Sequence, residues 1–118
     1  MIKLQRVYDY DREKDGFSVL IDRLWPRGVL KKKLNADEWM KDVAPSPDLR
    51  KWFGHDPDKW EEFKNKYTNE LDSKNALLDK ILDWEKEHKK ITLLYAAKDT
   101  KHTHALVLKS ALEKLKKE

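Results

Sequence analysis

The chain has 118 residues, of which 41% are charged and 39% hydrophobic, and its formal net charge is +4. It contains no cysteine, which excludes a disulfide framework, a thiolate nucleophile and a cysteine-ligated metal. No apolar run reaches the ~18 residues that would cross a membrane, and no secretory leader is present. We therefore expect one cytoplasmic domain, residues 1–118, built around one core.

The amino-terminal quarter of the chain predicts two strands. Apolar residues within 2–8 indicate the first strand, and a polar turn follows up to Gly16. The continuous apolar run 17–25 is typical of a strand that is buried on both faces. Pro26 and Gly28 end that run, because neither residue favours a continuing strand.

The next segment is less regular and leaves two alternatives open. Residues 29–35 indicate a connecting loop. Residues 36–43 fit either a short helix capped by Asn35 or a third strand that ends at Ala44. Two prolines then stop either element, and a helical stretch follows at 48–55.

The second half of the chain predicts three longer helices and one strand. The clearest helix spans 56–72, where Asp56 is a plausible N-cap and Pro57 occupies the first position. Its apolar stripe at helical spacing, which predicts one buried face, consists of Trp60, Phe63, Tyr67 and Leu71. The remaining elements are, in order, a helix within 73–90, an apolar strand at 91–97, a polar loop at 98–103 and an amphipathic carboxyl-terminal helix.

Strands that are apolar on both faces and separated by helices predict an α/β fold. We expect a compact three-layer sandwich with a short, mainly parallel sheet of three or four strands and helices on both faces. In such sheets ligands bind beyond the carboxyl ends of the strands. Two strands here lead into chemically rich segments, "DRLWPRG" at 22–28 and "KDTKHTH" at 98–104, which would open on the same edge.

The "RLWPRG" segment predicts a stiff turn that carries two arginines. Only five of the 26 basic residues are arginine, so the chain uses lysine wherever a generic positive charge suffices. Pro26 and Gly28 constrain the turn, and Arg23 and Arg27 could each grip a carboxylate or phosphate with a planar fork. The structural alternative is a turn whose Trp25 packs in the core and whose arginines pair with local aspartates.

Two further segments carry candidate chemistry. "APSPDLRKWFGHDP" contains a third arginine, a tryptophan and a His-Asp pair, which would act in acid–base chemistry or simply cap a helix. "KDTKHTH" is the densest titratable cluster, and its two imidazoles could move protons near neutral pH. A His-x-His pair supplies only two local metal ligands, so we assign no residue to a metal. The structural alternative is a polar loop in which Thr103 caps the last helix.

Three long segments, 19–28, 44–67 and 92–108, together resemble the YeaO-like group of a domain-of-unknown-function family of small bacterial and archaeal proteins. The resemblance spans nearly the whole chain and implies a compact α/β fold, but it supplies no activity. Members of the wider family often carry a cysteine in the last strand and a Cys-His-Arg-like motif after it. Tyr95 and residues 103–105 stand at those places, so the resemblance implies that cysteine-based chemistry is absent.

We expect a cleft that binds a small anionic ligand, and two functions remain open for it. The first is an enzyme that acts on a phosphorylated or nucleotide-like substrate; the second is a non-enzymatic module that binds nucleic acid or protein. Evenly mixed charges give nucleic acid weak support. The candidate catalytic residues are His55, His102, His104 and Asp99. The candidate anion- or substrate-binding residues are Arg23, Trp25, Arg27, Arg50, Trp52 and Lys98. The sequence leaves the cofactor and the oligomeric state unknown, and we expect no membrane partner.

Overall fold

The computed structural model describes residues 1–10 and 16–117. The polar turn predicted before Gly16 falls largely on residues outside these ranges. Among the described residues, four strands form one sheet in which all neighbouring strands are parallel. The order across the sheet is β1 (Ile2–Arg6), β4 (Ile91–Tyr95), β2 (Phe17–Leu20) and β3 (Glu38–Trp39).

Five helices connect and cover these strands in the described part of the chain. They are α1 (Lys31–Leu34), α2 (Pro47–Phe53), α3 (Trp60–Asp72), α4 (Asn75–His88) and α5 (His104–Lys116). Three 3-10 turns add to them: η1 (Val7–Asp9), η2 (Lys41–Val43) and η3 (Pro57–Lys59). None of the described helices is both long and apolar enough to span a membrane. The cytoplasmic location stays a prediction.

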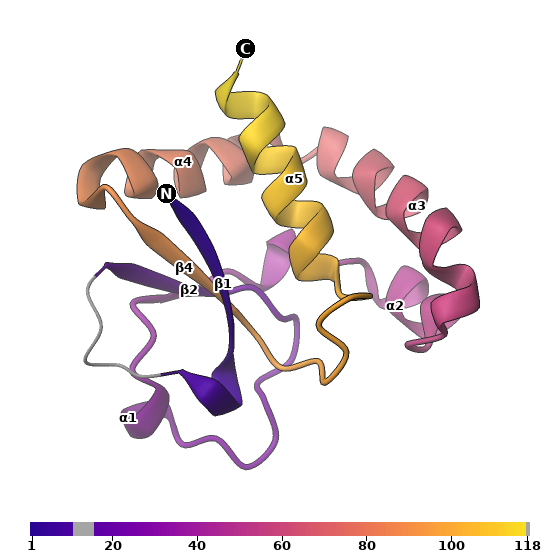
Figure 1. Cartoon of the computed structure of the whole chain (residues 1–118), viewed down its shortest axis with the longest axis horizontal. Helices are drawn as coiled ribbons and strands as arrows, with labels where there is room; N and C mark the ends of the chain where they lie inside the picture. The colour runs from indigo at the N-terminus through magenta and orange to yellow at the C-terminus, as the bar shows by residue number, and fades with distance from the viewer. Residues whose placement is uncertain (11–15, 118) are drawn as a thin grey trace.

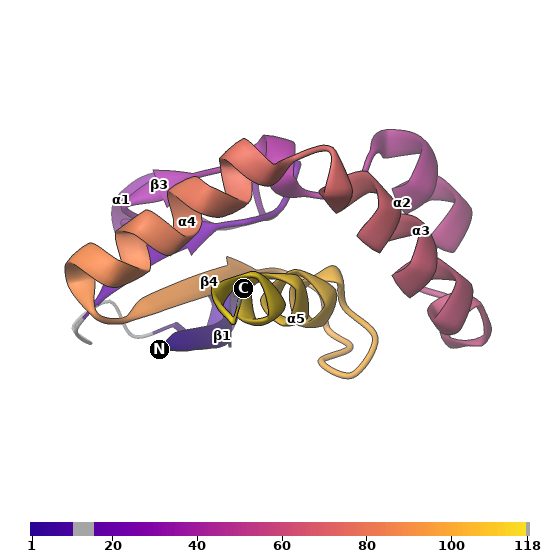
Figure 2. The same ribbon diagram turned by 90° about the horizontal axis from the view of Figure 1, so that it is seen from above.

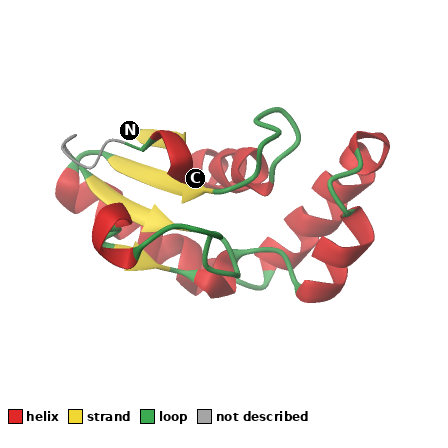
Figure 3. Ribbon diagram, turned by 90° about the horizontal axis from the view of Figure 1, so that it is seen from below, coloured by secondary structure: helices red, strands yellow, loops and turns green. Residues whose placement is uncertain are grey.

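The two faces of the sheet are covered unequally. Helices α4 and α5 lie over one face and contact β4, while the short helix α1 and the turn η1 lie on the opposite side (Figure 1, Figure 3). Helices α2 and α3 stand together beside the sheet rather than over it (Figure 2). The predicted three-layer α/β fold with a short parallel sheet is confirmed, with short elements forming its thinner layer.

Strand β4 contributes side chains to two separate cores, because successive residues of a strand point to opposite faces. Leu93 of β4 joins the main core with Phe63 of α3 and Leu108 of α5. Its neighbour Leu94 joins a smaller cluster that includes Leu34 of α1. Burial on both faces explains why β4 reads in sequence as an unbroken apolar run.

The strand predicted at 17–25 is shorter in the structure, since β2 ends at Leu20. Ile21 still donates its N–H to the carbonyl of Leu94 at 3.0 Å, but the chain then leaves the sheet as a loop. Beyond that point Ile21 is buried in the main core and Trp25 packs against the smaller one, while Leu24 is 59% exposed at the cleft. Burial by a loop gives the same sequence pattern as burial in a sheet.

The segment 36–43, predicted as either a short helix or a third strand, contains a short strand followed by a single helical turn. It holds the two-residue strand β3 and then the 3-10 turn η2. The loop predicted at 29–35 contains α1, which ends at Asn35 in a left-handed conformation with φ of 48°. Ser18 fixes the approach of β3, because its N–H donates to the carboxylate of Asp37 at 2.8 Å.

The connection between η2 and α2 crosses the molecule without regular structure, yet its carbonyl groups are all engaged. The hydroxyl of Tyr67 donates to the Val43 carbonyl at 2.7 Å. Arg23 holds the next two carbonyls, with Nη2 donating to Ala44 at 3.2 Å and Nε to Pro45 at 3.1 Å. Buried carbonyls need such partners where no helix or sheet supplies them.

Side chains from the end of α3 complete this connection. Glu70 accepts the backbone N–H of Ser46 at 2.8 Å and also binds its hydroxyl. The same Ser46 oxygen accepts the N–H of Leu49 at 3.2 Å and so caps α2. Lys74 donates to the Ala44 carbonyl at 3.2 Å. Burial lowers the pKa of Lys74, Glu70 opposes that shift and Arg23 adds to it.

Two of the predicted helix caps are confirmed. The carboxylate of Asp56 accepts the N–H of Asp58 at 3.0 Å, although the first turn that it caps is η3 rather than α3 itself. Thr103 caps α5 by accepting the N–H of Ala105 at 3.4 Å. Both caps place the preceding loops at fixed positions beside the ends of the strands.

Candidate functional site

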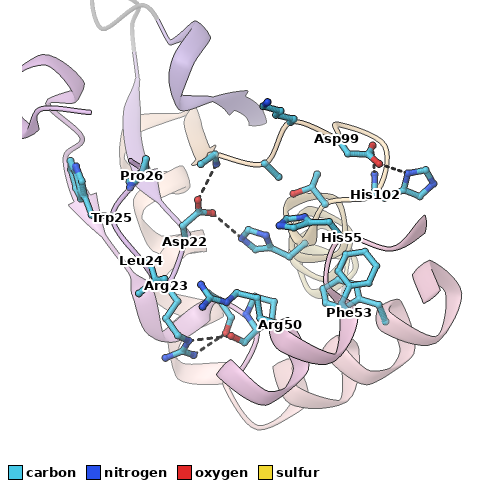
Figure 4. A pocket seen from close by; sticks show the side chains of 18 residues that line it. Asp22, Arg23, Leu24, Trp25, Pro26, Arg50, Phe53, His55, Asp99 and His102 are labelled. Atoms are coloured by element: carbon cyan, nitrogen blue, oxygen red, sulfur yellow. Dashed lines mark hydrogen bonds and ion pairs between the residues drawn. The ribbon is translucent and has the colours of Figure 1, made fainter. Parts of the chain in front are cut away.

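A cleft of about 560 Å³ opens where β2 and β4 end, between the sheet edge and α2 (Figure 4). Its walls come from three stretches that are far apart in the sequence: 22–26, 44–55 and 96–104, joined by Phe63 of α3. The volume lies within the range of small-molecule sites in proteins. The carboxyl edge of a parallel sheet is therefore hollowed here, as the sequence predicted.

Eight of the ten candidate site residues line this cleft. They are His55, His102, His104, Asp99, Arg23, Trp25, Arg50 and Lys98. Figure 4 shows Trp25 at one end of the cleft and His102 at the other, with Arg23 and Arg50 between them. The three sequence segments thus converge in space, while the roles of these residues stay predictions.

Arg27 and Trp52 lie outside the lining. Arg27 is exposed, and its backbone carbonyl accepts the hydroxyl of Tyr8 at 3.1 Å. Trp52 packs against the main core, and the ammonium groups of Lys59 and Lys66 lie 5.1 and 5.2 Å from its ring centroids. The structure therefore does not place these two side chains on the cleft lining, and their contact with a ligand stays a prediction.

The three cationic side chains of the cleft differ in what they already bind. Arg23 donates from Nε and Nη2 to backbone carbonyls, and Nη1 has no hydrogen-bond partner among the described residues. Arg50 and Lys98 are exposed and have no polar partner among the described residues. Arg23 therefore acts mainly as a brace of the cleft wall, and Arg50 and Lys98 are the side chains available to an anion.

Asp22 and His104 form a half-buried pair on the inner side of the cleft. One carboxylate oxygen of Asp22, Oδ2, accepts the N–H of Ala96 at 2.9 Å. The other, Oδ1, lies 3.3 Å from Nε2 of His104, and the side chains are 16% and 15% exposed. Nε2 also lies 3.1 Å from the carbonyl of Ile21. Both neighbours of Nε2 are acceptors, so Nε2 carries the proton of the neutral imidazole.

Asp99 and His102 form a second pair in which the opposite ring nitrogen is used. Oδ2 of Asp99 lies 2.7 Å from Nδ1 of His102, and Oδ1 accepts the N–H groups of Lys101 and His102 at 2.9 and 3.1 Å. The hydrogen bond from His102, followed by that from the Lys101 amide, lowers the pKa of Asp99. Asp99 thus holds the loop as a carboxylate, and both of its oxygens are engaged in hydrogen bonds within the loop.

We expect the two imidazoles of this loop to adopt opposite tautomers at pH 8. His104 should carry its proton on Nε2 and His102 on Nδ1, because a carboxylate or carbonyl faces those nitrogens. Nitrogen-15 NMR spectra that correlate the ring nitrogens with the ring carbon-bound protons distinguish the two forms. Finding the same tautomer at both positions would contradict the geometry described above.

His55 follows Gly54 in a tight reversal. Both residues have left-handed φ values, 59° for His55 and 53° for Gly54, which ends α2 and turns the imidazole toward the cleft. The ring is exposed and lies 6.3 Å from that of Phe53. Asp56 caps η3 instead of pairing with His55. Of the two predicted alternatives, a helix cap or an acid–base pair, the structure shows the cap.

Sequence reasoning did not place the apolar part of the lining. Leu24, Pro26, Phe53 and Phe63 contribute to the walls. Phe63 belongs to the helical stripe that predicts a buried face, and it is 2% exposed. A core stripe that also borders a cleft has the same periodicity as one that does not, so the sequence carries no signal for this role.

The described residues contain no group of three or more histidine, aspartate or glutamate side chains placed to hold a metal ion. His102 and His104 each have a protein partner for one ring nitrogen, as described above. The cleft is thus an apolar cavity with cationic side chains at its mouth and two carboxylate–imidazole pairs in its walls.

Comparisons with known proteins give one family and several relatives. Residues 1–118 match a family model described as the "Inactive DUF488-N3 subclade". "Uncharacterized protein YeaO" of Escherichia coli (strain K12) is 41% identical over 114 residues, covering 97% of this chain and 98% of that protein. "Uncharacterized protein Rv3073c" of Mycobacterium tuberculosis (strain H37Rv) is 36% identical over 113 residues, covering 94% and 92%. No solved structure matches significantly. The predicted YeaO-like resemblance is confirmed.

Proposed function

The chain belongs to the inactive DUF488-N3 subclade, and from that premise we propose that its cleft binds a small phosphorylated, nucleotide-like ligand without converting it. One observation carries the proposal. Arg50 and Lys98 reach an apolar cleft of about 560 Å³ from different segments and have no polar partner among the described residues. Unpaired cations beside an apolar wall suit a ligand with an anionic head and a flat apolar body.

The walls offer a place for each part of such a ligand. Pro26 at one end and Phe53 at the other present apolar surfaces on which a ring can pack (Figure 4). Arg50 can donate two parallel hydrogen bonds to a phosphate, and Lys98 adds a mobile charge. A nucleoside monophosphate has both features and a size that the cleft can accept.

Binding is favoured over catalysis by the chemistry of the lining. Thr103 is the only residue with a hydroxyl side chain among the lining residues that the structure describes, and its oxygen caps α5. The chain has no cysteine. A covalent mechanism that uses a serine, threonine or cysteine would therefore lack a free nucleophile in the described lining. The word "inactive" in the description of the family agrees with this interpretation.

Nucleic-acid binding through the tryptophans has less support. A lysine ammonium lies 5.1–5.8 Å from a ring centroid of every tryptophan, in the pairs Lys31–Trp25, Lys41–Trp39, Lys59–Trp52, Lys66–Trp52, Lys64–Trp60 and Lys80–Trp84. Bases that stack on aromatic residues need open ring faces. The lysine ammonium groups compete with bases for those ring faces. Rings covered by lysines therefore agree better with solvated surface residues than with a platform on which nucleic-acid bases stack.

The test is a thermal-shift and calorimetric screen with inorganic phosphate, sulfate, adenosine, ribose 5-phosphate and AMP. A ligand at about 100 times its dissociation constant adds roughly 2.7 kcal/mol, which raises the melting temperature by several degrees. We expect AMP to stabilise the protein more than adenosine or phosphate alone. Arg50→Gln should weaken AMP binding about tenfold or more, since it removes charge-assisted hydrogen bonds.

Arg27→Gln is the matched control, because it removes the same charge from an exposed arginine outside the cleft. It should leave the affinity for AMP within about twofold of the original value, apart from weak long-range electrostatics. The proposal fails if no phosphate in the panel shifts the melting temperature. It fails equally if the Arg27 and Arg50 variants lose the same affinity.

A further inference from the structure

We propose that His104 is a proton-linked contact of the cleft: it meets a dianionic phosphate monoester through Nδ1 and takes up a proton as that ligand binds. The inference rests on the proposed function and adds the charge class of its ligand. It begins from the hydrogen bonds of one imidazole. Nε2 of His104 is committed to the Ile21 carbonyl at 3.1 Å and faces Oδ1 of Asp22 at 3.3 Å.

The other ring nitrogen of His104 is open. Nδ1 has no hydrogen-bond partner among the described residues, and His104 lines the cleft. Within the same part of the chain, Oδ1 of Asp22 is the only fully buried side-chain nitrogen or oxygen without a hydrogen-bond partner. Nδ1 of His104 is therefore not sealed in the interior. It can accept a hydrogen bond when the ring is neutral and donate one when the ring is charged.

Asp22 gives the charged ring a counter-ion on its inner edge. Its carboxylate is fixed by the N–H of Ala96, so it does not need to move when the imidazole becomes charged. Tyr67 of α3, whose ring lies 6.1 Å away, stays a neutral phenol, because burial and then Glu70 raise its pKa well above the ordinary value. Among the described residues, Asp22 is thus the anion that pairs with His104.

The remaining charged and titratable groups of the cleft set the formal charge of its lining. Arg23, Arg50 and Lys98 are cationic, Asp22 and Asp99 are anionic, and His55 and His102 complete the set. With neutral imidazoles these side chains give the lining a formal charge of +1. A dianion bound at Nδ1 would add negative charge beside the ring and so favour the imidazolium in the complex.

This charge balance distinguishes a dianion from a monoanion. A monoanion would neutralise the lining by itself and would leave no reason for proton uptake. A dianion would reverse the formal charge to −1, and one proton on His104 would then restore neutrality. A phosphate monoester is largely dianionic at pH 8, since its second pKa is about 6. A phosphodiester carries a single charge and serves as the matched probe.

Calorimetry of AMP binding at pH 8, repeated in buffers of different ionisation enthalpy, counts the protons exchanged. We expect net uptake approaching one proton per AMP, and affinity that falls by up to tenfold per pH unit between pH 7.5 and 9. The 5′-methyl phosphodiester of AMP should bind with little proton uptake. His104→Gln should abolish the proton uptake that accompanies AMP binding. AMP should still bind to this variant, more weakly, through Arg50 and Lys98.

Two further variants separate the assigned proton site from a general effect. His88→Gln changes an imidazole that stacks on Phe17 outside the cleft, and it should leave proton uptake unchanged. Asp22→Asn keeps an acceptor for the Ala96 N–H but removes the negative charge beside His104, so it should reduce proton uptake. This variant keeps the proton site testable if His104→Gln folds poorly.

The outcomes distinguish this inference from the proposed function. AMP binding without proton uptake overturns the role of His104 and leaves the anion-binding cleft standing. Proton uptake that survives His104→Gln, or that the phosphodiester produces equally, has the same consequence. Absence of binding by every phosphate tested overturns the proposed function and this inference with it.

Discussion

Replacing Arg23 with glutamine should destabilise the protein by about 2–4 kcal/mol, the largest effect that we expect of any arginine substitution. The guanidinium donates to two successive carbonyls, those of Ala44 and Pro45. Glutamine is shorter and uncharged, and it cannot reach both. A hydrogen bond from a charged group contributes about 1.5–3 kcal/mol, and a buried carbonyl left without a partner costs about 1–3 kcal/mol. Lys74 still donates to the Ala44 carbonyl in the variant, so the Pro45 carbonyl is the one that loses its partner among the described residues.

Urea unfolding followed by tryptophan fluorescence measures this change. Arg27→Gln is again the control: that arginine belongs to the same turn, is exposed and has no side-chain partner among the described residues, so its loss should cost less than about 0.5 kcal/mol. Arg23→Lys should fall between the two, because a lysine supplies charge without the fork. Equal stability of the Arg23 and Arg27 variants would show that the carbonyl contacts do not hold the fold.

The same contacts link stability to the cleft. Ala44 and Pro45 line it, so the brace that Arg23 provides also sets the position of one wall. Arg23→Gln should consequently weaken ligand binding indirectly, through the position of the wall and not through a contact with the phosphate. Arg50→Gln should do the reverse and weaken binding while stability changes little. The two arginines of the cleft are separable by measuring both properties for each variant.

Much of the fold could be predicted because the informative signals were local or periodic. The run at 91–97 indicates a central strand, and β4 is indeed buried along its whole length. The stripe at Phe63, Tyr67 and Leu71 indicates a helix with one buried face, and all three residues are buried in α3. Thr103 indicates a helix start that the structure confirms.

The elements that were predicted poorly depend on distant partners. Strand β3 has two residues, and its pairing with β2 is supported by the hydrogen bonds between Ser18 and Asp37, 19 positions apart. No pattern within 36–43 encodes that pairing. The apolar run after Leu20 shows the same limitation, because a loop packed on a core and a buried strand both require apolar residues.

The site followed the same division. Residues on the loops at the strand ends could be predicted to converge, since parallel strands bring their carboxyl ends to one edge. The sequence could not show that Arg23 and Arg27 have different positions relative to the cleft. Which of the two turns inward is decided by carbonyls 21 and 22 residues away from Arg23. Local spacing makes both arginines look equally suited to an anion.

Glu85 provides a test of stability that leaves the cleft untouched. It lies on α4 at 5% exposure, and its carboxylate accepts Nζ of Lys116 at 2.9 Å as well as the terminal ammonium of Met1. Burial acts to raise the pKa of Glu85, but the hydrogen bonds from Lys116 and the amino terminus outweigh it, so the pKa lies below its ordinary value of 4.5. The ionised carboxylate thus joins the start of β1, α4 and α5.

Glu85→Gln should lower the free energy of unfolding by about 2 kcal/mol at pH 7, because an amide loses the charge-assisted bonds. A depressed pKa stabilises the folded state above the ordinary pKa, and this contribution disappears as the pH falls through the folded-state value. The original protein and the variant should therefore differ at pH 7 and converge as the pH falls below the ordinary range of a carboxyl group. Urea unfolding across this range measures the difference, with Glu87→Gln, an exposed neighbour on α4, as the control. A gap that persists in acid would mean that Glu85 acts through packing rather than through its charge.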